Sequence, residues 1–167
     1  HSTSEFNLKS PIENGKTFKE NSLIKSKYFS KKTGLLCLAD DSGLIVPALN
    51  GSPGLYSARF AGDGASDKIN QAKLLEKMCN FEGVKRQGYY IAAITLIRFP
   101  FDPDPTIAIG RWKGHIVNRP AGNGGFGYDP IFLPDGLNQT AAEIKASEKN
   151  KISHRAIAVK NLLASLI

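Results

Sequence analysis

The spacing of hydrophobic residues along the chain predicts four helices. The first extends from Thr17 to about Lys32, and the second from Ser66 to about Asn80. A third begins at the capping-box sequence TAAE, residues 140–143, and the last is capped by Ser153 and continues to the C-terminus. The apolar face expected for the second helix consists of Ile69, Ala72, Leu75 and Met78.

Runs of aliphatic, β-branched and aromatic residues between these helices predict strands. Leu35 to Ala39 is a short run of the buried kind, and Leu44 to Val46 follows it after a turn. The longest run is YYIAAITLIRF, residues 89–99, and residues 106–112 and 114–117 indicate further strands that pair with it as a hairpin. Because helices and strands alternate first and strands then cluster, the order predicts an α/β protein with a mixed sheet.

Length and composition agree with one soluble domain. The chain has 167 residues, of which 41% are hydrophobic and 22% charged, and this balance is typical of a globular protein with a core. No apolar run approaches the roughly 18 residues of a membrane span, and the N-terminus does not resemble a signal peptide. We therefore expect a cytoplasmic protein with no membrane partner. Cys37 and Cys79 fit reduced structural thiols better than a zinc site.

The charge of the chain indicates polyanionic partners. Its 22 basic and 15 acidic residues give a net charge of +7, which favours nucleotides, nucleic acids or acidic surfaces. The lysines are scattered along the chain and do not form one basic block. We therefore do not expect a nucleic-acid polymer as the partner.

The segment ADDSG, residues 39–43, places two carboxylates after an apolar run, where α/β proteins tend to bind ligands. Neighbouring residues of an extended segment point to opposite sides, so one of Asp40 and Asp41 can face a site while the other stabilises the loop. An ordinary Asp-Ser-Gly turn is the alternative. Glu13 and Asp41 together would provide the carboxylates that Mg²⁺ takes in addition to phosphate and water, and Lys25 is available for phosphate.

The glycine-rich segment GNGGFGYDPIF, residues 122–132, is the second candidate for a binding site. Glycines let the backbone adopt positive φ angles and approach a flat ligand closely. Phe126 and Tyr128 can then stack against the ligand, and Asp129 can accept a hydrogen bond. The alternative is a plain turn whose aromatic residues are anchored in the core.

The segment EKNKISHR, residues 148–155, is the third candidate. Because Ser153 caps a helix, His154 and Arg155 lie in its first turn beside the free backbone amides. Lys149, His154 and Arg155 provide donors for a carbonyl oxygen or a phosphate. The alternative is an exposed helix start with no ligand.

Four segments in order resemble the motifs of the inosine triphosphate pyrophosphatase family. They are TFKENSLIKSK, ADDSGLIVPALNGSPGLYSARFAG, GNGGFGYDPIFLPDG and TAAEIKASEKNKISHRAIA. The resemblance extends from Glu13 to the C-terminus and implies an elongated α/β fold with a long mixed sheet, two lobes and a central cleft. It also implies a homodimer that uses Mg²⁺ to hydrolyse non-standard purine nucleoside triphosphates, namely ITP, dITP and XTP, to the monophosphate and pyrophosphate.

The same resemblance implies roles for individual residues. Asp41 matches the proton acceptor and is associated with the metal, and Glu13 and Asp40 match further acidic metal positions. Ser42 matches a substrate contact, and Lys25 matches a lysine of the phosphate region. The positions that match contacts to the base and sugar are Phe126, Gly127, Tyr128, Asp129, Lys149, His154 and Arg155.

One motif of that family has no counterpart in the chain. The family begins with the pattern Ser/Thr-x-x-Asn-x-x-Lys, whose asparagine and lysine bind the triphosphate, and no such pattern precedes Glu13. We therefore expect a single domain over residues 1–167 without that N-terminal strand and loop. The alternative to an enzyme is a catalytically silent protein that binds ITP without releasing pyrophosphate. A nucleic-acid binder would instead show an oligonucleotide affinity that falls steeply with salt.

Overall fold

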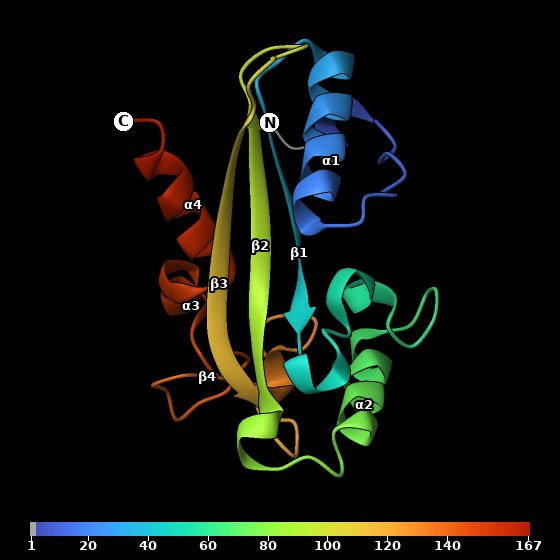
Figure 1. The fold of residues 1–167 in the computed structure, drawn as a ribbon, viewed down its shortest axis with the longest axis vertical. Helices are drawn as coiled ribbons and strands as arrows, with labels where there is room; N and C mark the ends of the chain where they lie inside the picture. Colours follow the sequence, from blue (N-terminus) through green and yellow to red (C-terminus); the bar gives the residue numbers. More distant parts are fainter. Residues whose placement is uncertain (1–2) are drawn as a thin grey trace.

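The computed structural model describes residues 3–167 and contains a long sheet with helices on both faces (Figure 1). Its strands lie side by side in sequence order: β1 (Cys37–Ile45), β2 (Gln87–Ile97), β3 (Thr106–Ile116) and β4 (Phe132–Pro134). The α/β class is therefore confirmed. Every strand pairing in residues 3–167 is antiparallel, so this sheet is antiparallel where a mixed one was expected.

In β1 and β3, two segments that were predicted separately form one continuous strand. The segments 106–112 and 114–117 belong to one strand, β3, which forms the expected hairpin with β2. Likewise, β1 joins the two short runs predicted before and after the ADDSG segment, although it leaves out Leu35, Leu36 and Val46. Asp40 pairs with Ile94 and Asp41 with Ala93, so these carboxylates lie in mid-strand. The turn alternative is wrong, because β2 provides backbone hydrogen-bond partners for β1 through this segment.

Helices cover the two faces of the sheet unevenly. Helix α1 (Phe18–Thr33) packs on β1 and β2 from one face, whereas α4 (His154–Ala164) packs on β2 and β3 from the other (Figure 1). None of the helices in the described part of the chain is both long and apolar enough to cross a membrane. The helices are α1 (Phe18–Thr33), α2 (Asp67–Lys77), α3 (Ala146–Ile152) and α4 (His154–Ala164).

The first and last helices begin where the sequence predicted. Thr17 Oγ1 accepts a hydrogen bond from the Glu20 amide at 3.1 Å, and Ser153 Oγ accepts one from the Ala156 amide at 3.3 Å. The start of α4 lies directly against β3, because a Cβ atom on Gly110 would come within 2.0 Å of the His154 carbonyl oxygen. This close approach fixes His154 against the sheet.

Helix α2 begins after Ser66 as predicted, but only part of the predicted face is buried. Met78 is buried and Leu75 packs against the core, whereas Ile69 is 55% exposed and Asn70 and Leu74 are buried instead. The reason is a polar contact: Asn70 Oδ1 accepts from the Ala61 amide at 2.8 Å. This bond turns the stripe that contains Asn70 toward the protein.

The third predicted helix starts later than expected. The Thr140 amide donates to Glu143 Oε2 at 2.8 Å, which is one bond of the predicted capping box, but residues 141–144 form a turn and a bend, and α3 begins only at Ala146. The amides of Ala141 and Ala142 instead donate to backbone carbonyls of the preceding loop and strand, at 2.8 and 3.3 Å. These tertiary hydrogen bonds hold the segment against the preceding loop and β4.

An aromatic core lies under the cavities described below. Tyr90, Trp112 and Phe132 are buried, and their rings contact one another, with the Tyr90 and Phe132 ring centres 4.8 Å apart. Tyr90 is also within contact distance of His154, the first residue of α4. The core therefore supports the helix start that carries the third candidate segment.

Candidate active site

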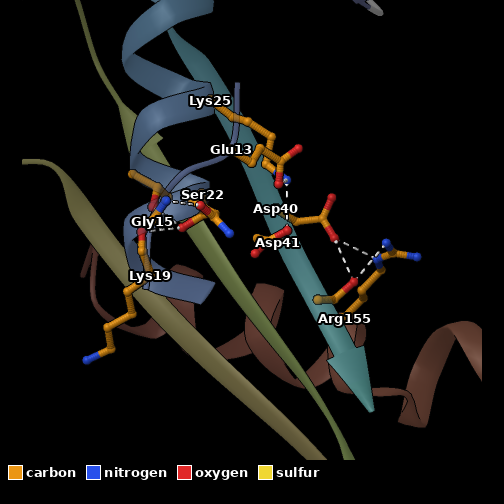
Figure 2. A network of polar contacts seen from close by, with 11 residues as sticks. Glu13, Gly15, Lys19, Ser22, Lys25, Asp40, Asp41 and Arg155 are labelled. Carbon is orange, nitrogen blue, oxygen red and sulfur yellow. Dashed lines mark hydrogen bonds and ion pairs between the residues drawn. The ribbon is translucent and has the colours of Figure 1, made fainter. Parts of the chain in front are cut away.

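Strand β1 directs its two neighbouring carboxylates to opposite faces of the sheet (Figure 2). Asp41 faces α1, where Lys25 Nζ lies 2.9 Å from Asp41 Oδ1. Asp40 faces the other way, and its Oδ2 accepts from Arg155 Nε at 2.8 Å. The alternation expected for an extended segment is confirmed. The resemblance had implied a shared metal site for Asp40, Asp41 and Glu13. Asp40 instead belongs to a different group of residues from Asp41 and Glu13.

The first group, which we name the carboxylate–lysine group, consists of Glu13, Lys25 and Asp41. The Lys25 ammonium bonds both carboxylates, since Nζ also lies 3.0 Å from Glu13 Oε2. Burial raises the pKa of Asp41, although its bond to Lys25 opposes this shift. Burial by itself would lower the pKa of Lys25, but the bonds to Asp41 and Glu13 outweigh it and raise this pKa. Lys25 is therefore positively charged at neutral pH.

The carboxylate–lysine group could bind a divalent cation only together with a substrate that supplies further oxygen atoms. Two carboxylates that converge on one positive charge match the requirement of Mg²⁺, which takes one or two carboxylates plus substrate phosphate and water oxygens. No cluster of three or more His, Cys, Asp or Glu side chains in residues 3–167 is arranged to hold a metal ion. A cation at this point would therefore share its coordination with phosphate oxygens.

The second group surrounds the exposed ring of Phe126. Arg155 Nη2 donates to Ser42 Oγ at 3.0 Å, and the Arg155 guanidinium lies 5.2 Å from the centre of the Phe126 ring. Phe126 is 52% exposed and Tyr128 only 2%. The core-anchor alternative therefore holds for Tyr128 but is wrong for Phe126, whose ring is available to a ligand.

Asp129 and Lys149 form a buried ion pair behind this ring. Asp129 is 1% exposed, and its Oδ2 also accepts from the Phe126 amide at 2.8 Å. Lys149 Nζ lies 4.8 Å from the centre of the Phe126 ring. The pair connects α3 to the glycine-rich loop, and Asp129 directs its carboxylate to protein donors.

His154 is buried and stacks on Tyr90, with the ring centres 4.7 Å apart and the planes at 10°. Its Nδ1 atom has no hydrogen-bond partner among the described residues. Burial, together with the positive charges of Arg155 and Lys149, lowers the pKa of His154 to about 3, so the ring is neutral at pH 7. A buried nitrogen without a partner is a position where a ligand can complete the hydrogen bonding.

We expect His154 to make the folded protein less stable in mild acid. Below pH 6.5 the unfolded chain takes up a proton on this ring, whereas the folded chain, with a pKa of about 3, does not. The free energy of unfolding should therefore fall with decreasing pH, by at most about 1.4 kcal/mol per pH unit from this group. Urea unfolding between pH 7 and 4 should show that the free energy of unfolding depends less steeply on pH in His154→Gln than in the original protein. The same substitution at His115, on β3, is the control, and equal slopes for all three proteins would contradict the prediction.

Phe126, His154 and Arg155 line both a cavity of 210 Å³ and one of 270 Å³. The smaller cavity also includes Ser42 and Gly43 of β1, and the larger one reaches the start of α3. Asp41 directly precedes Ser42 in β1, so the carboxylate–lysine group and the smaller cavity are one residue apart along the strand. Because the side chains of Asp41 and Ser42 point to opposite faces of the sheet, one ligand would reach both only around the edge at β1, the end strand of the sheet in residues 3–167.

Tyr90 is a member of the site that we did not predict. Its hydroxyl oxygen accepts from the Tyr128 amide at 3.1 Å, and its ring supports His154. The Tyr128 hydroxyl in turn donates to the Ser57 carbonyl oxygen at 2.9 Å. Tyr90 lies within a hydrophobic strand, and nothing in that run distinguishes a site residue from a core residue.

An α/β protein in which paired carboxylates and a lysine adjoin an aromatic cavity lined with cations has the organisation of a nucleotide-hydrolysing enzyme. The anionic part of a nucleotide suits the first group together with a divalent cation, because two carboxylates outweigh the charge of Lys25, and a flat base suits the second. The chain belongs to the Ham1 family, whose model matches residues 1–165.

Similar proteins cover most of the chain. A protein named dITP/XTP pyrophosphatase from Xanthomonas oryzae pv. oryzae is 51% identical over 150 residues, which are 90% of this chain and 75% of that protein. A protein of the same name from Photorhabdus laumondii subsp. laumondii is 46% identical over 162 residues, 97% of this chain and 82% of that one. The solved structure of a HAM1 protein from Coxiella burnetii is similar at a TM-score of 0.90 and 43% identity, over 98% of this chain and 83% of that chain.

Proposed function

We propose that this protein hydrolyses the non-standard purine nucleoside triphosphates ITP, dITP and XTP to the monophosphate and pyrophosphate. The observation that carries the proposal is that the carboxylate–lysine group and a cavity containing Phe126 and the unpartnered nitrogen of His154 lie on the two faces of the same short segment of β1, at the edge of the sheet. The names of the relatives from Xanthomonas and Photorhabdus support this substrate class.

The carboxylate–lysine group would carry the hydrolytic chemistry. A water oxygen attacks the α-phosphorus, the bond from that phosphorus to the bridging oxygen breaks, and pyrophosphate leaves. Asp41 orients this water or takes its proton, and Lys25 stabilises negative charge on the phosphates. Glu13 and Asp41 would hold Mg²⁺, which when bound neutralises further phosphate charge.

The Phe126 group would select the base. The Phe126 ring offers a face for stacking, and Lys149 and Arg155 lie beside it as donors. Hypoxanthine and xanthine present an oxygen acceptor at C6, whereas adenine presents an amino group that donates. Donors in this cavity that face the adenine amino group would lose their hydrogen-bond partners. Buried donors without partners make the free energy of binding less favourable.

Release of pyrophosphate from ITP and from ATP, each with and without Mg²⁺, tests the proposal. We expect kcat/KM for ITP to exceed that for ATP by about 100-fold or more. A site whose donors pair with an acceptor on the base discriminates strongly against a base that has a donor at the same position. Chelation of Mg²⁺ should abolish turnover. Equal rates for both nucleotides would contradict the selection of the base, and binding of ITP without pyrophosphate release would favour the silent nucleotide-binding protein.

A further inference from the structure

Helix α2 binds Gly127, in the glycine-rich loop, at both of its backbone polar groups. The Gly127 amide donates to Asp67 Oδ2 at 2.6 Å, and Gln71 Nε2 donates to the Gly127 carbonyl oxygen at 2.5 Å. Asp67 and Gln71 are one turn apart on α2 and therefore project from the same side of the helix. We name this pair of residues the α2 clamp.

The loop at Gly127 needs such contacts to hold one conformation. Gly127 has a φ of +59°, which glycine adopts readily and other residues rarely do. The amides on either side are also bound by side chains, that of Phe126 by Asp129 and that of Tyr128 by the Tyr90 hydroxyl oxygen. Three successive amides are thus fixed by three different elements of the fold, and the α2 clamp holds the middle one.

The clamp acts next to the exposed ring of the site. Phe126 directly precedes Gly127, so rotation of the Gly127 backbone would redirect the Phe126 ring. Asp67, Phe126 and Gly127 all line the 210 Å³ cavity. Gln71 is buried, whereas the Phe126 ring is half exposed.

We propose that Asp67 and Gln71 are positioning residues that hold the Phe126 ring at the angle needed to stack on the purine base. This inference rests on the proposed function. The clamp contacts the loop on the base side and has no hydrogen bond to the carboxylate–lysine group. It therefore sets the affinity for the substrate and leaves the hydrolytic step unchanged.

Steady-state kinetics with ITP and calorimetric binding of ITP test the clamp. We expect Asp67→Ala and Gln71→Leu each to raise KM and Kd about threefold to tenfold with kcat within about twofold, because stacking stabilises the ground state and transition state alike. Asp67→Asn keeps an oxygen acceptor for the Gly127 amide and should recover most of the affinity. Glu76→Ala, which removes an exposed carboxylate from the same helix, is the matched control and should leave KM unchanged.

A double-mutant cycle with Phe126→Ala separates positioning from a general effect on the fold. If the clamp acts through the ring, Asp67→Ala should raise KM little further once Phe126 is alanine. If Asp67→Ala raises KM in the Phe126→Ala protein by the same factor as in the original protein, the clamp is overturned. It is also overturned if Phe126→Ala raises KM and Asp67→Ala does not. An unchanged KM in Phe126→Ala itself would overturn both the stacking role in the proposed function and the clamp.

Asp67 also lies in the first turn of α2, where a negative charge stabilises the helix. Asp67→Asn removes that charge and keeps the acceptor, so it distinguishes the two roles. If Asp67→Asn raises KM as much as Asp67→Ala, the hydrogen bond to Gly127 is not the cause and the clamp is overturned. Recovery by Asn, with the loss confined to KM and Kd, supports it.

Discussion

Asp41→Asn is expected to lower kcat for ITP by about 1000-fold, within the range of about 100- to 10,000-fold that a positioned general base contributes. Asparagine keeps the size of the side chain and one oxygen that can accept from Lys25, but it cannot take a proton from water. The carboxylate–lysine group would also lose one negative charge toward Mg²⁺. Pyrophosphate release at saturating Mg²⁺ and ITP measures the loss in kcat, and calorimetry should show a Kd for ITP within a few-fold of the original.

Asp40→Asn is the matched control, because it is the same substitution one residue away on the opposite face of β1. Asp40 bonds Arg155, whose guanidinium lies over Phe126, so its loss should raise KM and leave most of kcat. Equal losses of kcat in Asp40→Asn and Asp41→Asn would contradict the division of the site into two groups. An unchanged kcat in Asp41→Asn would remove Asp41 from its role.

Lys149→Met is expected to lower the free energy of unfolding by about 3–5 kcal/mol, because it leaves Asp129 buried without its partner charge. The side chain of Asp129 is only 1% exposed, so water cannot replace the ammonium without rearrangement of the loop. Urea unfolding monitored by circular dichroism at pH 7 gives the change. The loss should be far greater than the 0–1 kcal/mol that is typical of an exposed ion pair.

Two variants check that the lost charge partner is the cause. Lys149→Met combined with Asp129→Asn removes the unpaired charge and keeps an acceptor for the Phe126 amide, so it should recover part of the stability. Lys151→Met, an exposed lysine on the same helix, should change stability by less than about 0.5 kcal/mol. A loss below about 1 kcal/mol for Lys149→Met would contradict the buried ion pair.

Local signals in the sequence predicted where three of the four helices begin, but not the start of α3. The caps at Thr17 and Ser153 and the start after Ser66 are confirmed, because a capping side chain and the amide that it binds are close in sequence. The structure brings Glu13, Lys25 and Asp41 together and leaves the ring of Phe126 exposed. The roles that the resemblance implies for these residues stay predictions.

Features that depend on distant partners could not be predicted. Nothing near ADDSG shows that β2 continues beside it, so Asp40 and Asp41 were expected at the end of a strand. The face that α2 buries is decided by the bond from Asn70 to the Ala61 backbone, which hydrophobic spacing does not register. The role of Tyr90 likewise depends on contacts with the loop and α4. The use of Mg²⁺ and the homodimer stay predictions.

Because Asp40 and Asp41 point in opposite directions, β1 sets the distance between the two groups of the site. Its backbone is held by a continuous ladder to β2, so the distance between the Arg155 side and the Lys25 side cannot vary much. A nucleotide anchored by its base would present to Asp41 whichever phosphorus lies at that distance. The position of the cleaved bond would then depend on its distance from the base. Additional phosphates at the free end of the substrate would not change which bond is cleaved.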